Sequence, residues 1–169
     1  MDRLWSPWRA AYVETANERP DLDDDTSIFA YLVAQDNDRE NLILWRGSEV
    51  FVIMNLHPYT NGHLLVLPYR VVADYDALTD AERIALAQTA NRCVGWLRTA
   101  LNPDGFNVGM NLGRAAGAGI PEHLHMHVVP RWSGDTNFMP VTGQTKVIPE
   151  SLQDTYAKIE AAIAADTGA

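Results

Sequence analysis

The chain has 169 residues, of which 47% are hydrophobic, and its 13 Lys and Arg stand against 22 Asp and Glu for a formal net charge of −9. This composition is sufficient for one ordinary packed domain without metal or disulfide support. The acidic balance argues against a nucleic-acid coat protein or a protein that binds acidic membrane surfaces, because both need basic patches.

The first predicted segment is an arm over residues 1–26, in which Trp5 and Trp8 are the apolar anchors. It ends in an acidic run at residues 21–25, which we interpret as a solvated loop because its spacing matches no calcium-binding loop; a divalent-cation site is the alternative. Ser27 then caps a short helix that extends to about residue 36.

Two β-rich runs follow, at residues 42–45 and 50–54, and the short link between them predicts a hairpin. Residues 55–62 are rich in turn formers. A third strand is predicted at residues 63–67, where Pro68 ends it because proline cannot donate a ladder hydrogen bond.

A long amphipathic helix comes next. Thr79 and Glu82 have the spacing of a capping box, in which each side chain satisfies the backbone donor of the other. The helix ends at Asn102 and Pro103. Its predicted apolar face consists of Ile84, Ala87, Ala90, Val94, Leu97 and Leu101.

The second β-block contains a predicted strand at residues 105–112, a loop of small residues at 113–119, and a fifth strand at 123–129 closed by Pro130. A helix is predicted in the tail, over residues 149–165. Two β-blocks separated by a long helix predict an α+β fold: a single domain with an antiparallel five-stranded sheet, one long helix and a C-terminal helix. The predicted organisation is an arm at 1–26, a domain at 27–135 and a tail with a helix at 136–169.

All five histidines lie between His57 and His127, and three of them, His123, His125 and His127, alternate with apolar residues. Alternate side chains of a strand share a face, so the three imidazoles are predicted to point the same way. A transition-metal site, a structural cluster and nucleophilic attack on phosphorus all use such a group. The spacing alone does not separate the metal site from the nucleophile.

The loop before these histidines favours the nucleophile. Residues 113–119 carry few side chains that would keep a ligand away, and successive exposed N–H groups can form an anion-binding nest. Such a loop alone is usually only a turn. Placed directly before a histidine face, it becomes a candidate phosphate cradle.

The run His123-Leu-His125-Met-His127-Val-Val resembles the motif of the histidine triad (HIT) family of hydrolases and transferases. A second segment, from Asn55 through the run Asn-Gly-His-Leu-Leu-Val-Leu-Pro at residues 61–68, also resembles the family. The flanking residues 3–9 and 131–138 are similar to the branch of bacterial diadenosine tetraphosphate phosphorylases, which is related to the fragile histidine triad type.

The resemblance implies roles for four histidines. His125 is the expected nucleophile toward the α-phosphorus of a nucleotide. His127 and His63 match positions that contact phosphate or assist the leaving group, and His123 matches the position that supports the other two. Neutral imidazole is nucleophilic near pH 7 when its other nitrogen is held by a hydrogen bond.

The resemblance also implies nucleotide contacts. Asn111 matches an amide that binds the α-phosphate, Asn55 matches a residue that binds the ribose hydroxyls, and Trp132 either closes the site or packs against the tail. Many relatives carry Ser or Thr where this chain has Gly119, so a side-chain donor to the leaving group is missing here. The expected nucleotide-binding residues are Asn55, Asn111, Gly117, Ala118, Gly119, His125, His127 and Trp132.

No metal site is predicted. Some relatives hold zinc with a Cys-x-x-Cys pair near the first helix, and this chain has no thiol at residues 27–30. We expect no tightly bound cofactor, although magnesium can arrive with a polyphosphate substrate. His57 is expected to be a loop histidine. Because HIT proteins are commonly homodimers, we expect a homodimer, with the long helix and the tail as its interface.

The expected activity is cleavage of dinucleoside polyphosphates at the α-phosphorus through a nucleotidyl-histidine intermediate, by phosphorolysis or hydrolysis. A non-catalytic AMP-binding regulatory module and a nucleoside phosphoramidate hydrolase are the alternatives. The partner is a small nucleotide, with no nucleic acid and no membrane. A lone Cys93, no signal-peptide run and no stretch of roughly 18 apolar residues predict a cytoplasmic protein.

Overall fold

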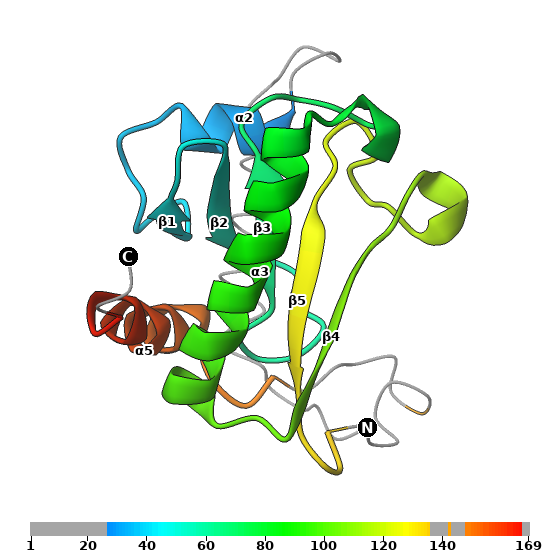
Figure 1. Ribbon diagram of the computed structural model, residues 1–169. Helices are drawn as coiled ribbons and strands as arrows, with labels where there is room; N and C mark the ends of the chain where they lie inside the picture. The colour runs from blue at the N-terminus through cyan, green and yellow to red at the C-terminus, as the bar shows by residue number, and fades with distance from the viewer. Residues whose placement is uncertain (1–26, 136–141, 143–147, 167–169) are drawn as a thin grey trace, which may run out of the picture.

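The computed structural model describes residues 27–135, 142 and 148–166 (Figure 1). Its centre is a five-stranded antiparallel sheet with the strand order β1-β2-β3-β5-β4. The predicted α+β fold is therefore confirmed. The arm predicted at residues 1–26, with Trp5, Trp8 and the acidic run, lies outside the described residues.

The elements largely match the predicted order. Within the described part of the chain, no helix is both long and apolar enough to span a membrane. The elements are α2 (Ile28–Val33), β1 (Ile43–Arg46), β2 (Val50–Met54), β3 (Leu64–Pro68), the 3-10 turn η1 (Tyr75–Ala77), α3 (Asp80–Leu101), β4 (Gly105–Met110), the 3-10 turn η2 (Arg114–Ala116), β5 (Met126–Arg131) and α5 (Leu152–Ala164).

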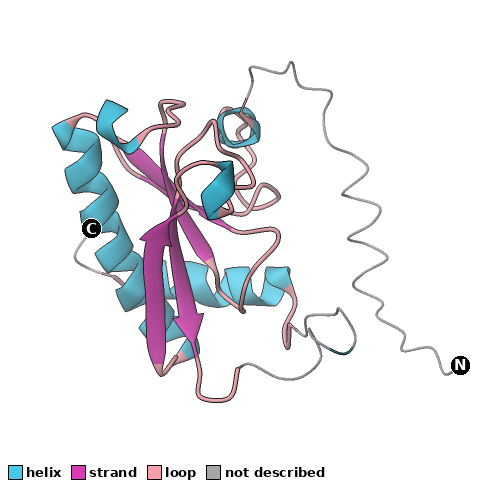
Figure 2. Ribbon diagram, turned by 90° about the vertical axis from the view of Figure 1, so that its right-hand side faces the viewer, coloured by secondary structure: helices cyan, strands magenta, loops and turns pink. Residues whose placement is uncertain are grey.

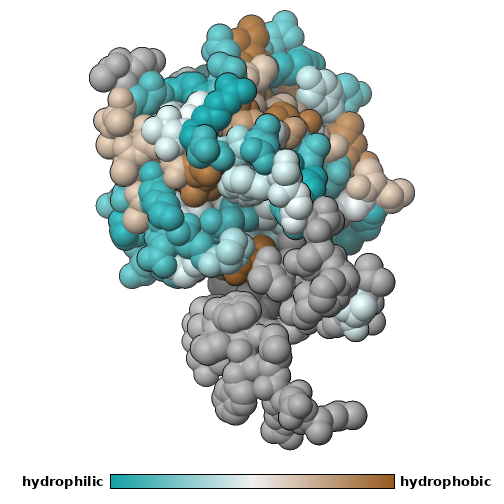
Figure 3. Space-filling model, turned by 90° about the horizontal axis from the view of Figure 1, so that it is seen from below, coloured by the Kyte–Doolittle hydropathy of each residue, from teal (hydrophilic) through white to brown (hydrophobic). Residues whose placement is uncertain are grey.

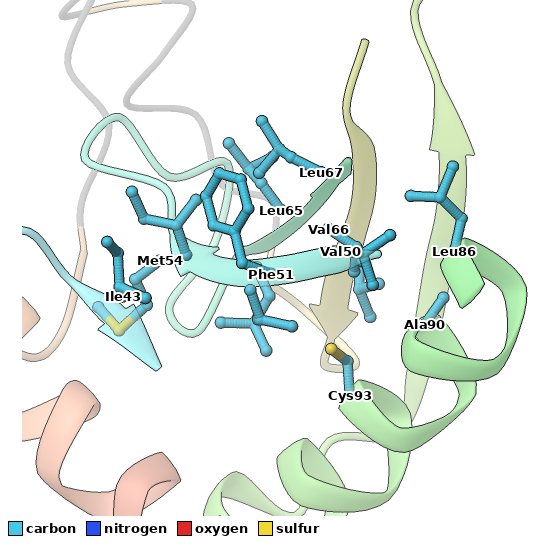
Figure 4. Packing of buried hydrophobic residues seen from close by; sticks show 14 of the residues in the cluster. Ile43, Val50, Phe51, Met54, Leu65, Val66, Leu67, Leu86, Ala90 and Cys93 are labelled. Atoms are coloured by element: carbon cyan, nitrogen blue, oxygen red, sulfur yellow. The ribbon is translucent and has the colours of Figure 1, made fainter. Parts of the chain in front are cut away.

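Both faces of the sheet are covered, since β2 and β3 are buried along their whole lengths. The helix α3 packs on β2, β3 and β5, and α5 packs on α3 and β1. Figure 2 shows α3 on one side of the sheet and short helices and loops on the other. In the core, Leu86, Ala90 and Cys93 of α3 lie beside Val50 and Val66 of the sheet (Figure 4).

Strand register places the functional face on the side opposite α3. Residues directly opposite each other in an antiparallel pair share a face. Leu65 of β3 is opposite both Ile53 of β2 and His127 of β5. The alternate row, which contains Val66, lies toward α3. His127 therefore projects from the face that the loops and α2 cover.

The predicted ends of the long helix are confirmed. The Thr79 hydroxyl accepts the N–H of Glu82 at 3.2 Å, and the Glu82 carboxylate accepts the N–H of Thr79 at 2.7 Å. At the other end Asn102 adopts the left-handed conformation, with φ of 47°, and Pro103 follows it. Both signals act through local backbone hydrogen bonding, which explains why the sequence located them correctly.

The predicted buried face of α3 is partly wrong. Ile84 is 56% exposed and Ala87 is also exposed, while Leu86, Cys93 and Trp96 are buried. The buried face is rotated around the helix relative to the prediction. The reason is that α3 packs against two partners, the sheet and α5, and the side of α3 that bears Trp96 faces α5. Helical spacing identifies an apolar stripe, but the second helix decides which flank of the stripe is covered.

The predicted tail helix is confirmed as α5. Tyr156 donates its hydroxyl to the carbonyl of Ile43 at 2.9 Å, and Trp96 donates its indole N–H to Asp166 at 2.8 Å. The guanidinium of Arg92 lies 4.8 Å from the ring of Trp45 and 5.0 Å from that of Trp96. The bond of Tyr156 fixes α5 to β1, the bond of Trp96 fixes the end of α5 to α3, and Arg92 links α3 to β1.

At the lower end of the molecule, the described surface mixes small hydrophobic groups with hydrophilic residues (Figure 3).

The buried carboxylate that starts α3 makes the fold sensitive to acid. The hydrogen bond from Arg70, 2.6 Å from Glu82, lowers the pKa of Glu82 from 4.5 to about 2. The ionised form is thus favoured in the folded chain, so its contribution is complete above pH 4.5 and is lost as the pH falls toward 2. We expect Glu82→Gln to lower the free energy of unfolding by about 1 kcal/mol at pH 7, because the half-exposed Arg70 is screened by water.

Urea unfolding at pH 7 and pH 3 measures this effect, with Glu49→Gln, at an exposed turn, as the matched control. The difference between wild-type protein and the Glu82 variant shrinks at the lower pH. An effect of equal size at both pH values would contradict the assignment.

Candidate active site

The strand that carries the histidines begins later than the sequence predicts. β5 starts at Met126, so His127 lies on the strand, and His123 and His125 lie in the segment that leads into it. Two backbone groups there have other partners: the N–H of Leu124 donates to the carbonyl of Val72 at 2.7 Å, and the carbonyl of His123 accepts from the ring of His125 at 2.8 Å. A strand ladder cannot use these groups, and pairing begins after them.

β5 also continues through Pro130, which the sequence predicts as its end. Pro130 lies opposite Phe106 of β4, beyond the residues that pair with β3. Its carbonyl accepts the hydroxyl of Thr60 at 2.7 Å. The missing N–H is tolerated because no third strand pairs with Pro130 on that side.

Four of the five histidines gather in one buried cluster on the sheet face opposite α3. His63 precedes β3 and lies beside His127 of β5, with His63 Nε2 2.9 Å from His127 Nδ1. The rings of His125 and His127 meet edge to face, 4.9 Å between centroids. The sequence prediction that His123, His125 and His127 share one face of a strand is wrong in this form, because only His127 lies on β5. His63 joins the cluster because β3 and β5 are neighbours.

The protons of His63 and His127 can be assigned from their partners. The N–H of Tyr59 donates to His63 Nδ1 at 3.1 Å, and a backbone N–H cannot accept, so His63 carries its proton on Nε2. That Nε2–H donates to His127 Nδ1. The proton of His127 is therefore on Nε2, which lies 3.4 Å from the amide nitrogen Nδ2 of Asn111. Both atoms are then donors, so they lie side by side without bonding to each other.

The proton of His125 lies on Nδ1, whereas those of His63 and His127 lie on Nε2. His125 Nδ1 lies 2.8 Å from the carbonyl oxygen of His123, and a carbonyl only accepts. The neutral ring therefore carries its proton on Nδ1 and a lone pair on Nε2. A bare Nε2 is the form that an imidazole nucleophile needs.

His123 is held from both sides. Its Nε2–H donates to the carbonyl of Pro68 at 2.9 Å, and its Nδ1 accepts the hydroxyl of Ser27 at 2.7 Å. Phe29 packs against both His123 and His125, with ring centroids 5.8 Å and 5.6 Å away. The carbonyl of His123 is thereby held where His125 needs it, which supports the positioning role implied for His123.

Ser27 does not cap α2 with its side chain, contrary to the sequence prediction, and α2 ends at Val33 rather than near residue 36. The hydroxyl is used by His123 instead. Spacing could not reveal this contact, because Ser27 and His123 are far apart in the chain. Tyr59 was likewise missed, since its contribution comes from its backbone N–H and its ring.

Burial keeps the supporting histidines uncharged. Desolvation, together with the nearby His125, lowers the pKa of His127 from 6.5 to about 4. Desolvation also lowers the pKa of His123, more than its bond to Pro68 raises it. Both rings are neutral at pH 7, which agrees with the hydrogen-bond assignment.

The two predicted asparagines lie beside the cluster. The side-chain amide of Asn55 is 3.2 Å from His63 Nδ1, and its oxygen accepts the N–H of His57 at 2.9 Å. Asn55 therefore shapes the turn and also contacts the cluster. Asn111 is half-buried and faces His127. His57 is an exposed loop residue, as expected.

The small-residue loop differs from the predicted nest. The N–H groups of Ala116, Gly117 and Ala118 donate to the carbonyls of Gly113 and Arg114 within the loop. These three donors are therefore used by the turn η2. Gly113 and Gly117 have φ of 77° and 92°, which explains why glycine stands there. A Cβ at Gly113, Gly117 or Gly119 would meet no atom within 4 Å, so the space beside all three is open.

Trp132 lies at the other end of β5 from His127, about 16 Å along the strand. There it lines a hollow with Leu101, Pro149 and Lys158. The structure therefore favours the second of the two roles considered for Trp132, packing against the tail. The four intervening strand residues, 128–131, separate it from the cluster.

Among the described residues, no group of three or more His, Cys, Asp or Glu side chains is arranged to hold a metal ion. The ring nitrogens of His63 and His123 and the Nδ1 atoms of His125 and His127 have hydrogen-bond partners. The arrangement is suited to a histidine nucleophile with one bare nitrogen, supported by neutral hydrogen-bond donors.

The chain thus combines a five-stranded antiparallel sheet with a buried histidine cluster on one of its faces. The family model described as the HIT domain matches residues 37–134, and the chain belongs to the HIT family. The resemblance stated from the triad motif is therefore confirmed.

Several known proteins are similar. The AP-4-A phosphorylase of Mycobacterium tuberculosis is 42% identical over 157 residues, which cover 92% of this chain and 80% of that protein. The nitrilase and fragile histidine triad fusion protein NitFhit of Caenorhabditis elegans is 40% identical over 55% of this chain and 21% of its own length. The crystal structure of a zinc-bound histidine triad family protein from Mycobacterium smegmatis matches with a TM-score of 0.68 and 25% identity, covering 82% of this chain and 94% of that one.

Removing the Ser27 hydroxyl tests the support of His123. In Ser27→Ala the buried His123 Nδ1 loses its donor, so we expect the free energy of unfolding to fall by about 1–3 kcal/mol. Chemical denaturation measures the change, and Ser48→Ala, at an exposed turn position, is the matched control. If the two variants were equally stable, Ser27 would have no such role.

Proposed function

We propose that the protein is an enzyme that cleaves dinucleoside polyphosphates at the α-phosphorus through a nucleotidyl intermediate on His125. The observation that carries this proposal is the bare Nε2 of His125, fixed by the hydrogen bond from Nδ1 to the carbonyl of His123. The similarity over 92% of the chain to a protein named AP-4-A phosphorylase supports this substrate class.

In the first step the lone pair of His125 Nε2 attacks the α-phosphorus. An N–P bond forms, the P–O bond to the rest of the polyphosphate breaks, and the leaving group departs with the electron pair as an anion. His127 Nε2–H and the amide N–H of Asn111 are neighbouring donors. They can bind the phosphate oxygens on which negative charge builds up during the attack.

Neutral donors suit an acidic protein that binds an anionic substrate. Residues 111–132 carry Arg114 and Arg131 against Glu122, and Arg131 is already paired with Asp135 at 2.6 Å. Binding therefore relies on local N–H donors rather than on a basic surface. Magnesium carried by the polyphosphate would offset part of its charge, and we propose no tightly bound cofactor.

In the second step an acceptor attacks the phosphorus, the N–P bond breaks, and His125 regains its lone pair. With water the acceptor loses a proton and the product is AMP; with inorganic phosphate the product is ADP. In both cases the first leaving group from diadenosine tetraphosphate is ATP.

Phosphoramidates are the less suitable substrates. An amine leaving group must gain a proton as it departs, whereas a polyphosphate departs as a stable anion. His127, with a pKa of about 4, is a poor proton donor at pH 7, and Gly119 provides no hydroxyl. The site therefore favours polyphosphates over this alternative.

His125→Ala tests the proposed function. We expect at least a 10³-fold loss of diadenosine tetraphosphate cleavage, because the nucleophile is removed. His57→Ala, which alters an exposed histidine outside the cluster, serves as the control. Nucleotide products are separated with and without phosphate, and base-quenched protein is analysed for an AMP adduct on His125. Full activity of His125→Ala, or AMP binding without turnover in the wild-type protein, would contradict the proposal.

We also propose a cytoplasmic homodimer, with a different interface from the one expected from the sequence. The apolar side of α3 packs on the sheet and α5, so it is used within one chain. β4 is at the edge of the sheet, and Val108 and, just beyond the strand, Leu112 are each 51% exposed. Two copies of the chain can pair through this edge.

The interface is tested by light scattering after size exclusion. We expect wild-type protein at twice the chain mass of 18.8 kDa. Val108→Asp should shift the protein toward a monomer, because it places a charge in the interface. Ile84→Asp, at an exposed position of α3, is the control. A monomeric wild-type protein, or dissociation by the Ile84 variant alone, would rule out this interface.

A further inference from the structure

The turn between β2 and β3, residues 55–62, is fixed at several points. Thr60 donates its hydroxyl to the carbonyl of Pro130 at 2.7 Å, and Asn61 donates to Glu150 at 3.2 Å. Gly62 has a φ of 75°, and a Cβ there would collide with Leu101. The turn therefore has a defined place beside the end of β5, and Tyr59 is held with it.

Tyr59 contacts the two histidines that are linked by a hydrogen bond. Its ring centroid lies 4.7 Å from that of His63, and 5.7 Å from that of His127 with an angle of 17° between the planes. Its backbone N–H donates to His63 Nδ1. The side chain is 48% exposed, so one part of the ring covers the imidazoles and the rest faces solvent.

We propose that Tyr59 is a positioning residue for this site: its backbone N–H, together with the amide of Asn55, determines which nitrogen of His63 carries the proton, and its ring shields the hydrogen bond between His63 and His127 from water. Because of these two successive hydrogen bonds, His127 presents a neutral Nε2–H to the phosphate. The catalytic consequence rests on the proposed function, whereas the effect on His127 does not.

The direction of the hydrogen bonds from Tyr59 through His63 to His127 explains how they oppose protonation of His127. A second proton on His127 Nδ1 would face the Nε2–H of His63. His63 could make room only by moving its proton to Nδ1, where the N–H of Tyr59 and the amide of Asn55 already donate. Two further groups in contact with His127 are the ring of His125, before β5, and the uncharged amide of Asn111, after β4. None of these groups supplies a negative charge.

Tyr59 is not a core residue, which separates the proposal from ordinary packing. A ring needed only for the core would be buried, as Phe51 and Tyr156 are. Removing the ring of Tyr59 leaves the backbone N–H in place but admits water to the His63–His127 pair. Hydration favours the charged form of an imidazole, so His127 should become easier to protonate.

The experiment is an NMR titration of the histidine rings in ¹⁵N-labelled full-length protein, with His127 assigned from His127→Gln. The variants are Tyr59→Ala, Tyr59→Phe and, as a matched control, Tyr75→Ala, since Tyr75 is 45% exposed and lies in η1. We expect Tyr59→Ala to raise the pKa of His127 by about one unit, whereas Tyr59→Phe and the control change it by less than about 0.2.

In turnover assays kcat of Tyr59→Ala should fall about tenfold while KM changes less than about threefold, because substrate contacts remain. Tyr59→Phe should restore kcat. Thermal unfolding verifies that each variant folds, and Tyr59→Asn replaces Tyr59→Ala if the latter does not.

An unchanged pKa of His127 in Tyr59→Ala, or an equal shift in Tyr59→Phe, would overturn the proposal. The titration requires no turnover. If wild-type protein cleaved no polyphosphate, the proposed function would fail, and the titration would still decide the positioning role of Tyr59.

Discussion

The hydrogen bond from His125 Nδ1 to the carbonyl of His123 is the interaction on which the chemistry of this site depends. It leaves one nitrogen of one imidazole bare within a cluster where the other rings act as donors or supports. The carbonyl is itself held in place because His123 is bonded on both sides, by Ser27 and by Pro68. A backbone group thus decides which atom reacts, and the buried hydroxyl of Ser27 stabilises that backbone group.

A second constraint runs in the opposite direction. From the N–H of Tyr59, donors follow one another through His63 to His127, so that the final donor is the Nε2–H of His127, beside the amide nitrogen of Asn111. Because aligned hydrogen bonds polarise one another in a buried setting, this series of hydrogen bonds strengthens its last donor without adding charge. An acidic protein can bind a phosphate anion in this way, since the site needs local donors and not a positive surface.

The sequence predicted more of the fold than of the contacts. Alternation of His123, His125 and His127 with apolar residues located the cluster, and the capping box of Thr79 located the start of α3, because both signals are local. The contact of Ser27 with His123 depends on packing between distant segments, which no spacing encodes. The buried flank of α3 was misplaced for the same reason, since α5 covers Trp96. The donors of the 113–119 loop were misjudged because the loop bonds to itself.

The most direct test of this account is the proton position on His125 in the resting protein. Two-dimensional ¹⁵N NMR of the ring nitrogens, assigned with His125→Gln, distinguishes a protonated from a bare nitrogen. We predict a protonated Nδ1 and a bare Nε2 for His125, with the reverse arrangement for His63 and His127. A His125 ring that carries its proton on Nε2 would contradict the account, because the nitrogen assigned to attack phosphorus would hold no lone pair.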